Sequence, residues 1–324
     1  MKRRSSVVAR VLFLVAIAAA AQPALADERF ALIVSGVSGG SKYAENQKKW
    51  TAQLETVLRG RMGFPRDHIV TLTEDGTGAS ASTEEGVAGA LAALQKRVTA
   101  NDTLLIVLFG HGTSVGTVTK FNLVGPDWDT NEWSHALAPI AGRIIFVNTA
   151  SSSFPFVKDL SAKNRIVIAA TDSPAQKYDT VFPQFFVEAL DKVDASDTDK
   201  NGRLSVWEAF VYASQAVKQY YDQKGTLVTE RAVLDDNGDG VGKEATATTG
   251  TDGVLAKTTF LDAEPAATAA NPAAAALEKQ RIALEAQIEE LKGRKQQMAP
   301  AEYDAELEKL AVELARISAQ IRSK

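Results

Sequence analysis

The chain of 324 residues contains no cysteine. Disulfide bonds are therefore excluded, and no thiol is available as a nucleophile. Only 3 histidines are present, and no cluster of histidine and acidic residues has the spacing of a zinc site. Beyond the N-terminus, no segment approaches the roughly 20 consecutive apolar residues of a membrane-spanning helix. Stability must come from burial of apolar side chains, together with any metal that the chain binds.

Residues 1–26 have the pattern of a secretory signal peptide. Residues 2–4 are basic, residues 11–21 form an apolar core, and residues 24–26 read Ala-Leu-Ala, a small-x-small cleavage site. A membrane anchor would need a longer apolar span and no cleavage site. We therefore expect cleavage after Ala26 and a periplasmic or secreted protein.

The balance of charge is acidic. The chain has 36 basic and 40 acidic residues, and four of the basic ones lie in the signal segment, so the exported chain is more acidic still. Nucleic acids and anionic membrane surfaces attract basic proteins. We therefore expect no nucleic-acid partner, and no membrane partner after signal cleavage.

Apolar runs and helical spacings alternate along residues 27–244. Such alternation favours the α/β class, with a mostly parallel sheet that carries helices on both faces. Continuous apolar runs predict strands, and spacings of three and four residues between apolar positions predict helices. The predicted strands are 30–34, 68–72, 104–109, 143–148 and 165–170, and the predicted helices are 43–58, 83–94, 131–137 and 182–190.

Residues 245–272 are rich in threonine, alanine and proline and are predicted to be a linker. Residues 273–324 are predicted to form a helical hairpin or coiled coil, because apolar residues recur every three or four positions on both sides of Pro300. The break at Pro300 makes an intrachain antiparallel pair our first choice, with self-association through this segment as the alternative. Arg281 and Lys295 interrupt the first apolar stripe. The apolar positions are Leu277, Leu284, Ile288, Leu291, Met298, Tyr303, Leu307, Leu310, Leu314, Ile317 and Ile321.

Two predicted strands end in residues that could carry chemistry. His111 lies between two glycines directly after strand 104–109, and Ser151 follows strand 143–148. In an open α/β sheet, groups at the carboxyl ends of adjacent strands converge on one crevice. The two side chains could therefore meet as a base and a nucleophile.

This arrangement resembles the catalytic core of the caspase and legumain superfamily of cysteine peptidases. In that family a histidine follows one strand in a His-Gly turn, and a cysteine follows the next strand. The resemblance implies a caspase/legumain-like domain over residues 27–244, with Ser151 in the place of the cysteine. It also implies an oxyanion pocket formed by backbone amides near Gly112 and Ser151.

A serine at this place leaves three interpretations open. A serine hydroxyl needs an imidazole in hydrogen-bond contact and a carboxylate that orients the imidazole, for which Asp127 and Asp172 are the candidates. Our preferred interpretation is a catalytically inactive peptidase homologue that binds a protein or peptide ligand in the degenerate cleft. The alternatives are a peptidase or hydrolase that uses Ser151 and His111, and a scaffold protein that acts through the coiled coil.

Residues 197–208 match the loop of an EF-hand calcium site. Oxygen-bearing side chains occupy its first, third, fifth and ninth positions, Gly202 allows the sharp turn at the sixth, and a glutamate at the twelfth can bind through both oxygens. Predicted helices at 182–190 and 204–221 flank the loop as an EF-hand helix pair. The predicted calcium ligands are Asp197, Asp199, Asn201, the backbone carbonyl of Arg203, Ser205 and Glu208.

A second acidic loop repeats the start of this motif with Asp235, Asn237 and Asp239. Its twelfth position is Thr246 rather than a glutamate, although Glu244 lies close. A weaker second ion site and a solvated acidic turn are both compatible with this pattern. Extracellular calcium sites of about 10⁻⁴–10⁻³ M affinity are filled where calcium is millimolar, so a weak site could still act in an exported protein.

Overall fold

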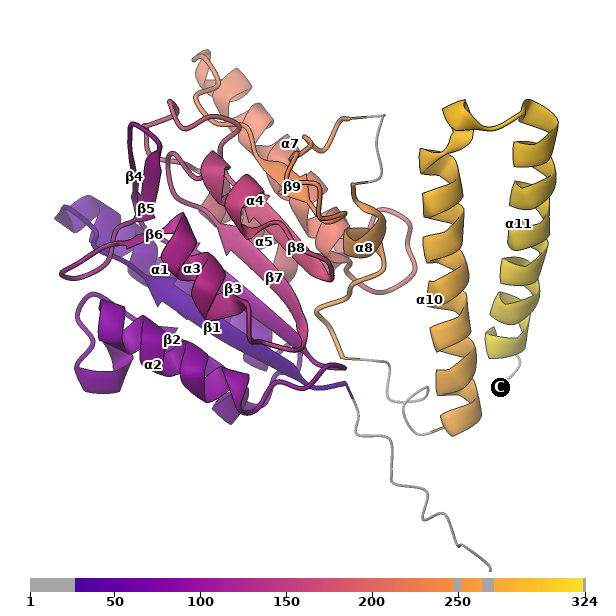
Figure 1. Cartoon of the computed structure of the whole chain (residues 1–324), viewed down its shortest axis with the longest axis horizontal. Helices are drawn as coiled ribbons and strands as arrows, with labels where there is room; N and C mark the ends of the chain where they lie inside the picture. The colour runs from indigo at the N-terminus through magenta and orange to yellow at the C-terminus, as the bar shows by residue number, and fades with distance from the viewer. Residues whose placement is uncertain (1–26, 248–251, 264–270, 323–324) are drawn as a thin grey trace, which may run out of the picture.

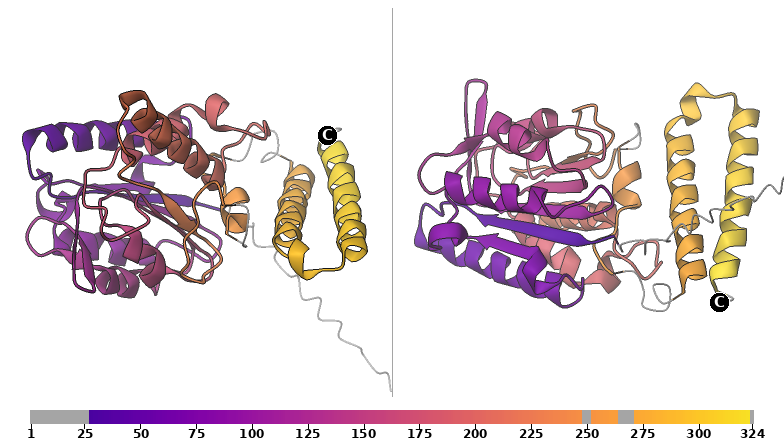
Figure 2. Two further views of the ribbon diagram at one scale, coloured as in Figure 1. Left: turned by 90° about the horizontal axis from the view of Figure 1, so that it is seen from above. Right: turned by 60° about the horizontal axis from the view of Figure 1, so that its bottom comes forward.

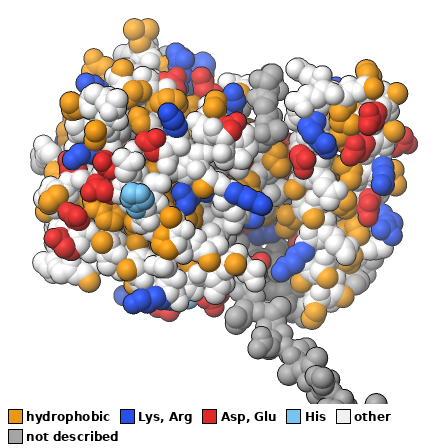
Figure 3. Space-filling view, viewed as in Figure 1, with side chains coloured by type: hydrophobic (Ala, Val, Ile, Leu, Met, Phe, Trp, Pro, Cys, Tyr) orange, Lys and Arg blue, Asp and Glu red, His pale blue; other side chains and the backbone are white. Residues whose placement is uncertain are grey.

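The computed structural model describes residues 27–247, 252–263 and 271–322. The predicted signal peptide, residues 1–26, lies outside these ranges. Among the helices described, none combines the length and apolar character needed to cross a membrane. On the face shown in Figure 3, acidic and basic side chains are interspersed.

A six-stranded sheet forms the centre of the molecule (Figure 1). Its strand order is β2-β1-β3-β7-β8-β9. Neighbouring strands are parallel except at the edge, where β9 runs antiparallel to β8. The α/β class with a mostly parallel sheet is confirmed, and all five predicted strands are present. The strands are β1 Arg29–Ser35, β2 Ile69–Leu72, β3 Thr103–Phe109, β7 Arg143–Asn148, β8 Arg165–Ala169 and β9 Val233–Asp235.

Helices cover both faces of this sheet (Figure 2). Successive strand residues point to opposite faces, so Ala31 and Ile33 join one core whereas Phe30 and Leu32 join the other. Helices α1, α5 and α7 bury the first core, and α2, α3 and α4 bury the second. The bounds are α1 Ser41–Arg59, α2 Glu84–Gln95, α3 Thr130–Leu137, α4 Phe154–Leu160, α5 Phe182–Asp191 and α7 Val206–Lys224.

A small antiparallel sheet follows β3 and was not predicted. It consists of β4 Gly112–Val115, β5 Val118–Phe121 and β6 Trp128–Asp129. The strands are short and half exposed, so they lack the continuous apolar runs that marked the central strands. The pairing of Gly112 with Phe121 begins directly after His111 and holds that turn against the larger sheet.

The C-terminal segment forms two antiparallel helices, α10 Pro272–Gly293 and α11 Pro300–Arg322 (Figure 1). All eleven predicted apolar positions pack in one core between them, which confirms the predicted helix pair. The two basic residues that interrupt the apolar stripe, Arg281 and Lys295, make charged contacts on the helix pair. Arg281 forms ion pairs with Glu278 and Glu285, and the ammonium of Lys295 lies over the Tyr303 ring.

The described part of the predicted linker packs against the sheet. It contains α8 Val254–Lys257, which lies between α7 and α10. Ala256 and Leu261 are fully buried in the first core, and Phe260 forms a β-bridge with Ser205. Lys257 pairs with Glu289 of α10. Residues 252–263 are therefore part of what we call the sheet body, the described residues from 27 to 263.

Candidate functional sites

His111 and Ser151 lie at the same edge of the sheet. β3 and β7 are neighbours, with Leu108 opposite Asn148, and His111 and Ser151 follow them at their carboxyl ends. The approach of the two strand ends is close. A Cβ atom on Gly112 would lie 2.2 Å from the backbone carbonyl oxygen of Ser151, so only a glycine allows β4 to begin there.

Both ring nitrogens of His111 face hydrogen-bond acceptors. Nε2 lies 2.8 Å from the backbone carbonyl oxygen of Ser38, in the loop after β1, and Nδ1 lies 3.3 Å from the carboxylate of Asp179. Because a backbone carbonyl only accepts, Nε2 donates to Ser38, and the carboxylate of Asp179 faces the other ring nitrogen. The ring of Tyr43 packs edge-on against His111 at 5.0 Å, and the hydrogen bond between Tyr43 and Asp179 raises the pKa of the phenol.

The carboxylate that lies beside the His111 ring is not one of the two candidates from the sequence, Asp127 and Asp172. A carboxylate oxygen of Asp172 lies 3.7 Å from a guanidinium nitrogen of Arg231. Asp127 accepts a hydrogen bond from the backbone N–H of Leu123 within its own turn. Asp179 takes the place beside His111 instead. It comes from the loop between β8 and α5, whose path back over the sheet edge no local sequence signal revealed.

The hydroxyl of Ser151 is turned toward the backbone. Among the described residues, its Oγ makes hydrogen bonds only with Gly112, at 3.3 Å from the carbonyl oxygen and 3.4 Å from the N–H. Gly112 N–H, expected in the oxyanion pocket, is thus engaged by the serine. A small pocket of about 30 Å³ lies beside His111 and is lined in part by Tyr43, Trp50 and Asp179. In the described structure no hydrogen bond joins the His111 ring to the Ser151 hydroxyl.

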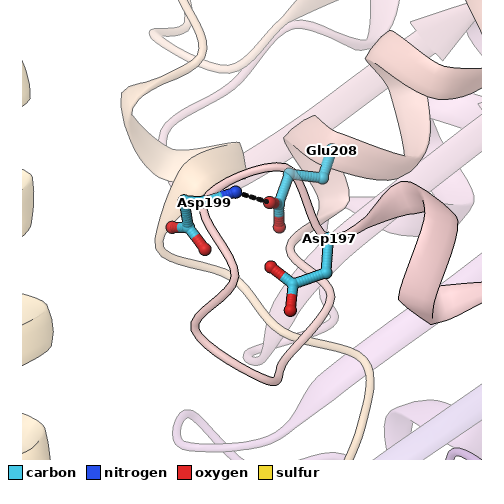
Figure 4. A group of neighbouring side chains, drawn as sticks. All are labelled: Asp197, Asp199 and Glu208. Carbon is cyan, nitrogen blue, oxygen red and sulfur yellow. Dashed lines mark hydrogen bonds between the residues drawn. The ribbon is translucent and has the colours of Figure 1, made fainter.

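The 197–208 loop gathers three carboxylates. Oxygens of Asp197, Asp199 and Glu208 lie within 4.8 Å of one another (Figure 4). The loop is entered from the one-turn helix α6 Val193–Ser196 and continues into α7. The chain breaks helical geometry at Lys192, so the entering helix is this short turn and not the predicted 182–190 helix.

Backbone N–H groups of the loop donate hydrogen bonds to its carboxylates. Glu208 accepts hydrogen bonds from the backbone N–H groups of Thr198, Asp199 and Ser205. Burial, together with the charges of Glu208 and Asp197, raises the pKa of Asp199. Carboxylate oxygens are the ligands that a hard divalent cation prefers. The other predicted ligands also line the loop: Asn201 accepts from Arg203 N–H, Ser205 caps α7, and Arg203 directs its side chain away to Asp262.

A second group of carboxylates forms at the end of β9. Oxygens of Asp235, Asp239 and Asp252 lie within 4.8 Å of one another. Asn237, predicted with the first two, donates to Asp239 within the same loop. Asp252 was not predicted, because it lies outside the motif and reaches the loop only through the tertiary fold. Burial and the neighbouring carboxylates raise the pKa of Asp252 to about 7. Glu244, the acidic residue that lies close to the twelfth position of the motif, is not part of this group. One of its carboxylate oxygens lies 4.0 Å from a guanidinium nitrogen of Arg231.

Comparisons with known proteins give likenesses to solved structures only. No model of a protein family and no curated protein matches the chain. Among solved structures, the X-ray structure of a secreted C11 cysteine protease from Bacteroides thetaiotaomicron, "iotapain", is similar to the chain, with 11% sequence identity and a TM-score of 0.39. The alignment covers 65% of this chain and 66% of the other, so the chain spans just under two thirds of that structure's length. No cysteine is present in this chain.

Proposed function

We propose that this chain is an exported, calcium-binding homologue of caspase/legumain-like peptidases that has no peptidase activity and binds a peptide or protein ligand beside its degenerate catalytic cleft. The contact pattern of His111 carries the proposal. Nε2 of His111 lies at the carbonyl oxygen of Ser38, Nδ1 faces Asp179, and the Ser151 hydroxyl bonds to Gly112, so the ring and the hydroxyl each have other partners.

Calcium binding rests on the 197–208 loop. Its three converging carboxylates, the turn at Gly202 and the Ser205–Phe260 bridge match an EF-hand loop joined to a partner segment. Asp197, Asp199, Asn201, Ser205 and Glu208 would hold the ion with the backbone carbonyl of Arg203. The ion would draw α6 and α7 together, and it takes part in no chemical step.

Labelling with a fluorophosphonate probe tests the absence of serine-hydrolase activity. We expect no adduct on Ser151, whether calcium or a chelator is present, and no cleavage of a mixed peptide substrate pool. The matched control is Ser153→Ala, because Ser153 lies in the same turn and binds Thr171 rather than the cleft. An adduct on Ser151 that His111→Ala abolishes would establish the alternative, a Ser151–His111 hydrolase.

Ligand binding is tested by selecting peptides from a random display library on the chain. Tyr178, whose exposed fraction is 72%, directly precedes Asp179 in the chain, and exposed aromatic residues are common at binding surfaces. We expect Tyr178→Ala to weaken the selected peptides, whereas Val312→Ala on α11 leaves them unaffected. Peptides that depend only on residues 271–322 would instead support the third interpretation, a scaffold acting through the helix pair.

A further inference from the structure

We propose that Asp235, Asp239 and Asp252 bind a second calcium ion, and that this ion fastens residues 252–263 to the sheet. This site is separate from the 197–208 loop and does not depend on the proposed function. The acidic loop supplies two of the carboxylates, and the third comes from 13 or more residues further along the chain, where the motif places no ligand.

The burial of Asp235 is the first reason. Its side chain is fully buried at the end of β9, and neither carboxylate oxygen has a hydrogen-bond partner in the described structure. One oxygen of Asp252 is likewise buried and unpartnered. A buried carboxylate without hydrogen-bond donors is destabilising, and a cation between these oxygens would offset that cost.

The second reason is the way in which Asp252 is held. Asp236 turns away from the group and accepts hydrogen bonds from the backbone N–H groups of Gly253 and Ala256, at 2.8 and 2.7 Å, at the start of α8. Its own N–H donates to Asp252 at 3.2 Å. The two adjacent aspartates therefore act differently. Asp236 positions the segment that carries Asp252, whereas Asp235 is a ligand of the ion.

The chemistry of the group selects calcium. All the side-chain donors are oxygens, which excludes the nitrogen and sulfur sets that zinc prefers. Three carboxylates from an irregular loop suit the flexible coordination of calcium better than the strict octahedron of magnesium. Asp252 also lines a cavity of about 430 Å³ between the sheet body and α10, through which the ion can enter from solvent.

The consequence reaches the C-terminal helices. Residues 252–263 carry Phe260, which bridges Ser205 of the first loop, and Lys257, which pairs with Glu289 of α10. An ion that holds Asp252 against Asp235 therefore supports both the first calcium loop and the docking of the helix pair.

Calorimetric titration of the chain from Asp27 onward with calcium chloride tests the site. The proposal expects two ions for the parent protein, one for Glu208→Gln, one for Asp252→Asn and none for the double variant. Glu244→Gln is the matched control and should still bind two. Loss of an ion with Glu244→Gln, or two ions retained by Asp252→Asn, would overturn the assignment of Asp252.

Thermal melting distinguishes an ion ligand from a residue that matters only for packing. In a chelator, Asp252→Asn should raise the melting temperature, because it removes one of three crowded negative charges. In millimolar calcium it should lower the melting temperature relative to the parent. A decrease under both conditions would mean that Asp252 is structural and that no ion binds there.

Hydrogen exchange tests the fastening of the segment. Calcium should slow amide exchange in residues 252–261 of the parent and of Glu208→Gln, and it should not do so in Asp252→Asn. The proposal fails if Glu208→Gln abolishes the calcium-dependent slowing of exchange in this segment and Asp252→Asn leaves it unchanged. Calcium would then protect the segment through the 197–208 loop.

Discussion

His111 connects separate loops at the carboxyl end of the central strands. Its ring joins the loop after β1, through Ser38, to the loop before α5, through Asp179. Ser151 fits beside it because a hydroxyl can both donate to and accept from Gly112. These contacts join the loops after β1, β3 and β7 and the loop before α5.

Replacement of Ser151 by cysteine would give the chain its single thiol and a direct measure of this arrangement. We expect Ser151→Cys to react with iodoacetamide slowly and at a rate that His111→Ala leaves within about threefold, because the imidazole is engaged by Ser38 and Asp179. Adding Asp179→Ala frees Nδ1 and should speed the reaction by about tenfold in a His111-dependent way. A strong dependence on His111 without the Asp179 change would show that the dyad is already assembled.

Glu230 is a second residue of interest at this scale, because its buried surroundings shift its pKa. It is almost fully buried and accepts hydrogen bonds from the N–H groups of Val181 and Phe182 at the start of α5 and from the hydroxyl of Tyr221. Burial raises its pKa from 4.5 to about 7. The folded chain therefore binds this proton more tightly than the unfolded chain does.

The stabilisation from the Glu230 proton is complete below pH 4.5 and is lost as the pH rises through about 7. Between pH 5 and pH 8 we expect the free energy of unfolding to fall by up to about 3 kcal/mol through this group. Glu230→Gln should remove that part of the fall, which urea unfolding in a chelator can measure. Parallel pH profiles for the two proteins would contradict the expectation.

At the scale of elements, the sequence predicted what local patterns encode. Runs such as 104–109 are apolar because they are buried on both faces, so their character was visible without the fold. Strand β9 was missed because it has only three residues and follows no regular spacing. Asp179 and Asp252 were missed because long loops bring them to their sites, and a loop's path depends on contacts between residues far apart in sequence.

The loop between α6 and α7 gives a prediction at this scale. Glu208→Gln replaces one of the oxygens that would bind calcium with an amide nitrogen, so calcium affinity at this loop should fall by at least about tenfold. At a calcium concentration of about ten times the parent's dissociation constant, the loop's calcium-dependent stabilisation of about 1.4 kcal/mol should then largely disappear. Thermal melting with and without calcium measures it, and Glu244→Gln serves as the control. An unchanged calcium response would remove this loop as a site.

At the scale of the whole molecule, the apolar core of the helix pair is distinct from the two cores of the sheet body. A chain that ends at Asn271 should therefore fold, melt cooperatively and still bind two calcium ions. A chain that ends at Ala247 loses Asp252, Ala256 and Leu261, and we expect it to be less stable by about 3–5 kcal/mol. Urea unfolding followed by circular dichroism compares the two. If the longer truncation is unfolded, the helix pair is part of the folding unit.

The edge strand β9 has a consequence for how the protein behaves at high concentration. On its outer side, the backbone N–H and carbonyl of Leu234 both pair with Lys243, at 2.8 Å each, so the chain covers its own sheet edge. Open edges are where separate molecules add strands to one another and aggregate. The loop that supplies Lys243 is the one that begins with Asp235, so its loosening on calcium removal would uncover this edge. Chelators should then shorten the shelf life of concentrated solutions before they cause any visible unfolding.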